Sequence, residues 1–279
     1  MLRYNIDTNV LCLALAERLT VTTLTSKDGT AIVFDRTGQG PAVILVVGAF
    51  NDRATGAPLA QALEQHFTVY NYDRRGRGES GDTPPYAVDR EIEDLESLID
   101  EAGGAAYVFG YSSGAILALK AAAHGLPITK LALYEPPPTG AHAGALAAEL
   151  AQLIETERRG DAVECFQIKG VGIPAEVVAS MRNAPFRPAL ERIAHTLVYE
   201  MTILDDATNP PTGIDTIRVP TLIMDGEHTT TVMHQMAETL ANALPNGQHR
   251  MLEGQSHDIV PAVLAPVLET FFTATTAAR

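Results

Sequence analysis

A serine framed by two glycines, between an apolar run and a helical run, constrains the fold of this chain most. The stretch is Gly110-Tyr111-Ser112-Ser113-Gly114, which follows the apolar residues 105–109 and precedes an alanine-rich helical pattern at 115–124. A turn this tight holds its central residue in a strained backbone conformation, and the flanking glycines avoid clashes with the neighbouring strand and helix. The motif therefore predicts a strand-turn-helix unit that exposes the Ser112 hydroxyl at the carboxyl edge of a sheet.

Apolar runs and helical patterns alternate along the chain, which predicts an α/β fold with a doubly wound, mostly parallel sheet of eight strands. The middle runs are apolar on both faces, as in parallel strands that are covered by helices on two sides. The expected strands are 19–25, 31–35, 42–47, 68–72, 107–109, 130–134, 221–224 and 249–252. The expected helices are 58–65, 88–101, 115–124, 232–244 and 261–275.

The interval from Pro136 to Gly213 interrupts this alternation, since it contains helical stretches and no convincing strand. About 75 residues are too many for a simple connection, so we expect a helical cap at 136–213 over the carboxyl edge of the sheet, where ligands of open α/β sheets bind. The core domain then comprises residues 19–135 and 214–279. Within residues 1–18 the stretch 9–16 is apolar, but little positive charge precedes it, and we interpret residues 1–18 as a short amphipathic leader or an overlong start rather than a signal peptide.

The composition argues against several classes of partner. The 279 residues carry 34 acidic and 20 basic side chains, a formal net charge of −14, and they contain no basic block of the kind that binds nucleic acid or an anionic membrane. The longest uncharged stretch, 102–119, is interrupted by glycines and serines, so we expect no membrane span. The two cysteines, Cys12 and Cys165, are far apart, and no His, Cys and Asp cluster has metal-ligand spacing.

These observations lead us to expect a cytoplasmic protein with a small-molecule substrate and with neither a metal nor a cofactor. No dinucleotide-binding fingerprint is present, and the glycine- and arginine-rich turn at 73–80 lacks the lysine of a phosphate loop. The sequence leaves the oligomeric state open, a homodimer included.

Four motifs in consecutive order resemble those of the α/β-hydrolase superfamily. They are Val47-Gly48-Ala49 after an apolar strand, the Asp73–Ser80 turn, the serine motif around Ser112, and Gly254-Gln255-Ser256-His257 near the end of the chain. The resemblance extends from about residue 19 onward and implies that fold, with Ser112 as the nucleophile and His257 as its base. It also implies that the 73–80 turn supports the nucleophile loop. His228, which follows the strand at 221–224, is the alternative base.

The sequence departs from the family pattern at the catalytic acid. Relatives usually carry an aspartate at the position that Thr229 occupies here, directly after residues 226–228. An imidazole that becomes charged needs a carboxylate to fix its tautomer and stabilise its charge, so another acid is expected. Glu135 is the first choice, because some haloalkane dehalogenases and fungal zearalenone lactonases of this superfamily take their acid from the same strand end. Asp225 is the alternative acid, and the remaining candidates are Asp205, Asp206 and Asp258.

Two backbone N–H groups at about 3 Å from the developing negative charge are expected to complete the site. Ser113, the residue after the nucleophile, supplies one. The loop that follows the strand at 42–47 supplies the other, with Ala49 as the expected donor and its neighbours Gly48 and Phe50 as alternatives. The resemblance thus implies a cofactor-independent serine hydrolase of carboxylic esters or lactones, with a hydrophobic substrate. The alternatives are a lyase or perhydrolase on the same fold and a ligand-binding protein with a vestigial site.

Overall fold

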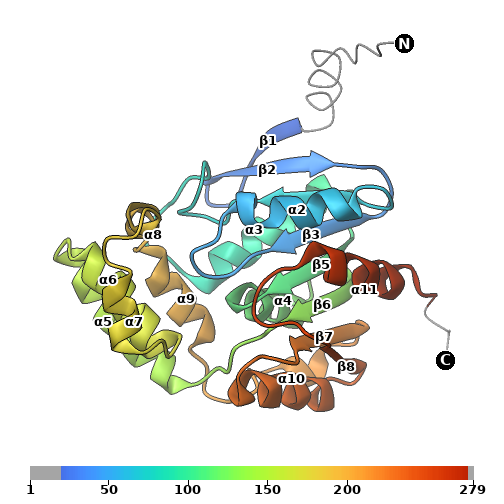
Figure 1. Cartoon of the computed structure of the whole chain (residues 1–279). Helices are drawn as coiled ribbons and strands as arrows, with labels where there is room; N and C mark the ends of the chain where they lie inside the picture. The colour runs from blue at the N-terminus through green and yellow to red at the C-terminus, as the bar shows by residue number, and fades with distance from the viewer. Residues whose placement is uncertain (1–19, 276–279) are drawn as a thin grey trace, which may run out of the picture.

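One sheet of eight strands forms the centre of the molecule (Figure 1). The computed structural model describes residues 20–275, so the predicted leader at 1–18 lies outside the described residues. The strands are β1 Thr20–Thr25, β2 Ala31–Thr37, β3 Ala42–Val46, β4 Thr68–Tyr72, β5 Ala106–Tyr111, β6 Ile128–Tyr134, β7 Thr221–Gly226 and β8 Gly247–Leu252. Their order across the sheet is β1-β2-β4-β3-β5-β6-β7-β8.

The pairing of these strands confirms the predicted mostly parallel α/β sheet. Only the β1–β2 and β2–β4 pairs are antiparallel, and every pair from β4 to β8 is parallel. All five residues of β4 and all six of β7 are buried. Strands that are buried along their whole length need helices on both faces of the sheet, as the continuous apolar runs in the sequence indicated.

Helices cover the sheet on two sides (Figure 1). The helices α2 Arg53–Leu63 and α11 Pro261–Thr273 pack on one face, where Leu59 and Phe272 are buried. The helices α3 Val88–Glu101, α4 Ser113–Ala123 and α10 Thr231–Ala243 pack on the other face. This arrangement places the N-terminus of α4 at the carboxyl end of β5, which is the position that the serine motif predicted.

The start of α2 differs from the predicted start at residue 58. The helix begins at Arg53 because the side chain of Asp52 accepts a hydrogen bond from the Ala54 N–H at 2.9 Å. This contact satisfies one of the free amides in the first helical turn. Pro58 therefore lies inside the helix rather than at its first position.

Five helices and one π-helical turn occupy the interval at 136–213, where the described residues contain no strand. They are α5 Ala141–Glu155, α6 Arg159–Cys165, the turn η1 Phe166–Gly170, α7 Ala175–Ser180, α8 Arg187–Arg192 and α9 Thr196–Leu204. Figure 1 shows them gathered at one side of the sheet, with α9 next to the core. A short 3-10 helix, η2 Ile214–Thr216, leads back to β7. No helix within residues 20–275 has the length and apolar character needed to cross a membrane.

Candidate active site

Ser112 occupies a strained turn between β5 and α4. Its backbone has φ 55° and ψ −129°, outside the regions that a non-glycine residue normally adopts. A Cβ on Gly110 would lie 2.6 Å from the Ala115 Cα, and a Cβ on Gly114 would lie 2.3 Å from the Val46 carbonyl oxygen. Both glycines are therefore required for steric reasons, because any side chain there would displace backbone atoms.

His257 approaches Ser112 from the loop between β8 and α11. Its Nε2 lies 3.2 Å from the Ser112 Oγ, which is within reach of a proton transfer. The Tyr134 hydroxyl donates a hydrogen bond to the Ser256 carbonyl and thereby holds this loop against the sheet. Burial raises the pKa of Tyr134 above its usual range, so the phenol keeps the proton that it donates.

Glu135 faces the other nitrogen of His257. The Glu135 residue is fully buried, and its Oε2 lies 3.2 Å from the His257 Nδ1. Its Oε1 accepts a hydrogen bond from the Gly226 N–H at 2.7 Å, and Oε2 accepts one from the Thr229 hydroxyl at 2.6 Å. Both oxygens of the carboxylate are thus held by donors, as an anion that orients an imidazole requires.

The backbone at Glu135 explains why this glutamate reaches His257. Its φ is 53°, and its N–H donates to the Met224 carbonyl at 2.8 Å, which extends the contact of β6 with β7 by one residue. The chain turns at this point and the side chain is directed across the end of β7 rather than into the cap.

The other acids named from the sequence contact different groups. Asp225 accepts hydrogen bonds from His234 and His249, and Asp206 accepts one from Lys120. The Asp258 carboxylate contacts only the hydroxyl of its neighbour Ser256 in the described part of the chain. The hydrogen bonds among residues 20–275 include none from the side chain of His228, the alternative base, to Ser112.

The loop that follows β3 lies directly against Ser112. A Cβ on Gly48 would come within 2.8 Å of the Ser112 Cβ. The Gly48 carbonyl accepts a hydrogen bond from the Arg77 guanidinium at 2.7 Å. In a trans peptide the C=O and N–H point in opposite directions, so the Ala49 N–H is directed away from Arg77. That N–H has no acceptor among the described residues. The Ser113 N–H is also free for a ligand, because it belongs to the first turn of α4.

A buried ion-pair network connects this loop to the cap. Arg74 and Arg77, from the turn after β4, both pair with Glu200 of α9, and all three side chains are fully buried. Arg74 also donates to the Val47 carbonyl at 3.1 Å and pairs with Glu91 at 2.6 Å. Burial disfavours the charge of Glu91, yet the nearby Arg74 guanidinium lowers the pKa of that carboxyl. Sequence reasoning missed Glu200, although a single acid in the apolar stretch of α9 is a usable signal for a buried partner.

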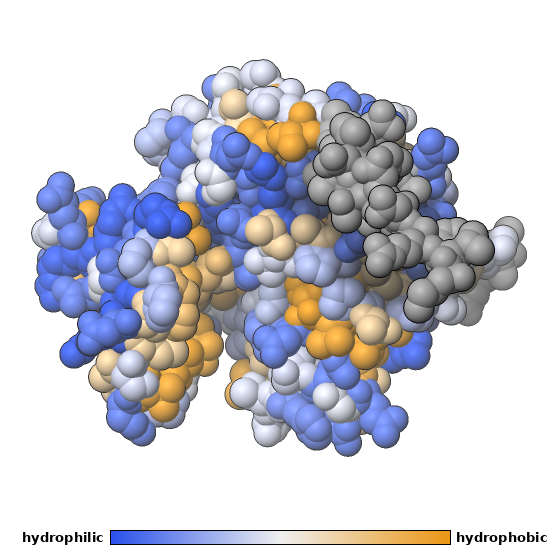
Figure 2. Space-filling view, turned by 45° about the horizontal axis from the view of Figure 1, so that its top comes forward, coloured by the Kyte–Doolittle hydropathy of each residue, from blue (hydrophilic) through white to orange (hydrophobic). Residues whose placement is uncertain are grey.

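A cavity of about 450 Å³ lies between the cap and the core. Phe50, from the loop after β3, borders it on the core side, and Leu190 and Ile193 border it on the cap side. Polar groups of Asp82 and His195 also face it. Figure 2 shows a hollow between the two lobes, with apolar surface along the lobe that the cap forms. A small molecule with apolar parts fits such surroundings.

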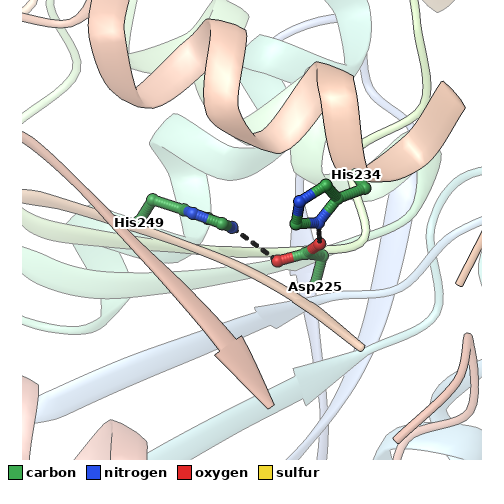
Figure 3. A group of neighbouring side chains, drawn as sticks. All are labelled: Asp225, His234 and His249. Carbon is green, nitrogen blue, oxygen red and sulfur yellow. Dashed lines mark hydrogen bonds and ion pairs between the residues drawn. The ribbon is translucent and has the colours of Figure 1, made fainter. Parts of the chain in front are cut away.

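A second group of titratable side chains lies outside this site. Asp225, His234 and His249 converge from β7, α10 and β8 (Figure 3). The hydrogen bond with Asp225 raises the pKa of His234. Metal-ligand spacing in the sequence did not indicate this group, because only the β7–β8 register and the packing of α10 bring the three residues together.

The Alpha/beta hydrolase family profile matches residues 43–268 of this chain. An alpha/beta hydrolase of known structure from Sphaerobacter thermophilus is 51% identical in sequence, with a TM-score of 0.83 over 90% of this chain and 100% of that chain. The enol-lactonase from Burkholderia xenovorans has a TM-score of 0.67 at 23% identity, over 91% of this chain and 100% of that chain. This second likeness concerns the fold alone.

One curated relative is N-formylmaleamate deformylase from Pseudomonas putida, which is 33% identical over 126 residues. The match covers 44% of this chain and 47% of the deformylase, so this chain spans about half the length of that protein. The family profile, in contrast, covers most of this chain and includes every strand from β3 to β8. The chain therefore belongs to the alpha/beta hydrolase family.

Proposed function

We propose that this protein is a cofactor-independent serine hydrolase that cleaves a carboxylic ester or lactone of a hydrophobic small molecule through an acyl-enzyme. The observation that carries this proposal is the continuous relay Ser112–His257–Glu135, with 3.2 Å between the Ser112 Oγ and Nε2 and 3.2 Å between Nδ1 and the Glu135 Oε2. Serine is a weak nucleophile, and a relay of this kind activates it.

In the first half of the reaction, the Ser112 Oγ attacks the substrate carbonyl carbon while the His257 Nε2 takes the serine proton. The electron pair of the carbonyl bond moves to the oxygen, and the N–H groups of Ala49 and Ser113 donate to that oxyanion. The intermediate collapses and breaks the bond to the leaving alcohol, which receives the proton from His257. In a lactone this alcohol stays attached to the acyl group.

In the second half, His257 removes a proton from water, and the resulting hydroxide attacks the acyl carbon. Collapse of this intermediate releases the carboxylic acid and returns the proton to Ser112. Glu135 stays ionised throughout and stabilises the imidazolium through Nδ1. The cavity beside Phe50, Leu190 and Ile193 is the proposed binding site for the hydrophobic part of the substrate.

The names of similar proteins support the hydrolytic class without choosing the substrate. They include an enol-lactonase from Burkholderia xenovorans, an esterase from Rhodococcus and the N-formylmaleamate deformylase from Pseudomonas putida. The fully hydrogen-bonded Glu135 disfavours the alternative of a vestigial binding site. A lyase or perhydrolase with the same relay is distinguished by experiment.

A fluorophosphonate probe, p-nitrophenyl butyrate and a small lactone test the proposal together. We expect covalent labelling at Ser112 and turnover of at least one of the two substrate classes, both abolished by Ser112→Ala. Ser113→Ala is the matched control, because it removes a neighbouring hydroxyl that has no hydrogen-bond partner and keeps the backbone N–H. Labelling without hydrolysis of a panel of esters and lactones would contradict the hydrolytic function, and labelling that persists in Ser112→Ala would contradict the assigned nucleophile.

A further inference from the structure

We propose that Asp225, His234 and His249 bind one divalent transition-metal ion, with Zn²⁺ as the ion to test, at a site separate from the serine relay. Two imidazoles and one carboxylate are the donor set that zinc and its neighbours in the first transition row accept. The potential ligand atoms of these three residues all lie within 4.8 Å of one another.

The sheet register brings two of the ligands to the same face. In the parallel β7–β8 pair, Ile223 lies opposite His249, and Asp225 lies opposite Met251. Because side chains alternate along a strand, Ile223 and Asp225 share one face of the sheet. Asp225 and His249 are therefore diagonal neighbours. Their Oδ1 and Nε2 atoms are 2.6 Å apart.

The third ligand comes from the helix that covers this face. His234 lies in the first turn of α10, and its Nδ1 forms a hydrogen bond with the Oδ2 of Asp225. Figure 3 shows the two imidazole rings on opposite sides of the carboxylate, each with a nitrogen directed at it. The rings are 5.6 Å apart between centroids, and their ligand nitrogens lie within 4.8 Å of each other. An ion there replaces the bridging proton of each hydrogen bond.

The charge of the cluster favours a cation. The Asp225 carboxylate is fully buried, and its ion-pair partners among the described residues are these two histidines alone. The Glu238 Oε1 adds a second negative group at 3.4 Å from the His234 Nε2. A buried carboxylate is costly without a positive partner. A dication at the three ligand atoms supplies it.

The contact with Glu238 is also the one that a metal-binding histidine usually makes. Such a histidine donates its non-ligating N–H to a carboxylate, which fixes the tautomer and leaves the other nitrogen free for the metal. In His234 the carboxylate of Glu238 faces Nε2, so when an ion displaces the proton of Nδ1, the remaining N–H stays at Nε2 and the Nδ1 lone pair binds the ion.

An ion can reach the site from solvent. The His234 side chain is 37% exposed and the His249 side chain is 24% exposed, while Asp225 lies beneath them. The open side leaves room for a water ligand in the fourth tetrahedral position. Gly226, the next residue after Asp225, donates its N–H to Glu135. A bound ion would therefore fasten the end of β7 that holds the proposed catalytic acid, and we assign it a stabilising role.

The test uses the full chain without an affinity tag, stripped with a chelator and titrated with Zn²⁺ by calorimetry. We expect one ion per chain, a rise of several degrees in Tm with Zn²⁺, and visible d–d absorption when Co²⁺ replaces it. His234→Gln and His249→Gln should each weaken binding by at least about tenfold, and Glu238→Gln should weaken it by about tenfold. His228→Gln, a change of an exposed histidine on the neighbouring loop, is the matched control and should bind as the unaltered chain does.

Two results would overturn the proposal. One is the absence of saturable Zn²⁺ binding to the stripped protein at millimolar ion, and the other is binding that survives both histidine replacements. Circular dichroism shows whether each variant is folded. If His249→Gln fails to fold, Zn²⁺ binding by His234→Gln still tests the site, because His234 is partly exposed. Ser112→Ala should bind Zn²⁺ with unchanged affinity, so the outcome is independent of the proposed hydrolase function.

Discussion

Thr229 donates its hydroxyl to the Glu135 Oε2 at 2.6 Å. Thr229 stands where relatives usually carry the catalytic aspartate, and Glu135 comes from the end of the neighbouring strand β6. Thr229 and Glu135 therefore contact each other on the Nδ1 side of His257. Thr229 thus provides a hydrogen-bond donor to the carboxylate that we propose as the catalytic acid. A donor there stabilises the ionised form of Glu135.

Replacement of Glu135 by glutamine should lower kcat by about 10³- to 10⁴-fold with little change in KM, since the imidazolium loses its counter-charge while the shape of the site is kept. Steady-state kinetics on the substrate found in the ester and lactone panel measures the effect. Asp225→Asn is the comparison, because Asp225 contacts His234 and His249 rather than His257. A loss of kcat in Asp225→Asn that equals the loss in Glu135→Gln would show that the acid is assigned to the wrong strand.

Thr229→Asp should partly restore activity to a Glu135→Ala variant. The Thr229 Oγ1 is within hydrogen-bonding distance of the Glu135 Oε2, so a carboxylate at position 229 has access to the same region beside the His257 Nδ1. We expect a kcat at least about tenfold above that of Glu135→Ala alone, as a charge regained near the imidazole implies. Thr229→Asn in the same background is the control, and equal rates for the two double variants would rule out the charge as the cause.

Thr229→Asp in the otherwise unaltered chain should lower stability instead. Two carboxylates would then lie in contact, and like charges at this distance disfavour ionisation of both. Urea unfolding at pH 8 and pH 5 measures the difference. The loss should be larger at pH 8, where both groups ionise, and a loss independent of pH would contradict the electrostatic reason.

Glu200→Gln should destabilise the protein by about 3 kcal/mol, since it leaves Arg74 and Arg77 buried with one negative partner fewer. Activity should fall as well, because the Arg77 guanidinium holds the Gly48 carbonyl beside Ser112. Chemical denaturation gives the free energy of unfolding. Glu149→Gln is the control, because its pair with Lys169 is about half exposed and should contribute less than about 1 kcal/mol.

The stabilising effect of Asp206 should depend on pH. This carboxylate follows α9 and accepts hydrogen bonds from the Thr212 hydroxyl at 2.8 Å and the Lys120 Nζ at 3.0 Å. Burial opposes its charge, but these donors outweigh that effect and lower its pKa from 3.8 to about 2. A depressed pKa in the folded state stabilises the fold at pH values above 3.8, and this contribution is lost as the pH falls toward 2.

Asp206→Asn should therefore reduce the free energy of unfolding by about 1 to 2 kcal/mol at pH 7, with allowance for the partial exposure of the side chain. The gap between the variant and the unaltered chain should narrow below pH 4. Urea denaturation at a series of pH values follows both proteins. A gap that stays constant down to pH 3 would mean that shape, rather than charge, sets the contribution of Asp206.

Local patterns in the sequence were enough to predict the strands of the central sheet and the turn that holds Ser112. Strand-like runs, apolar on both faces in the middle of the sheet, predicted all eight strands, and α3 has the predicted bounds, Val88–Glu101. The serine motif predicted a strand-turn-helix unit with a strained backbone at Ser112, where φ is 55°, and with glycines at 110 and 114 that let neighbouring backbone approach closely. Such features depend on residues that are near one another in the chain, and sequence shows them directly.

Contacts between segments that are distant in the sequence could be identified only from the tertiary structure. Glu135 was one of several candidate acids until the geometry placed its Oε2, rather than a carboxylate oxygen of Asp225, against His257. The ion pairs of Glu200 with Arg74 and Arg77 join residues more than a hundred positions apart. Likewise, Asp225 meets His249 only because of the register of β7 on β8. The reason is physical: side-chain periodicity decides which face of an element is buried, whereas strand order, register and helix packing decide which buried groups meet.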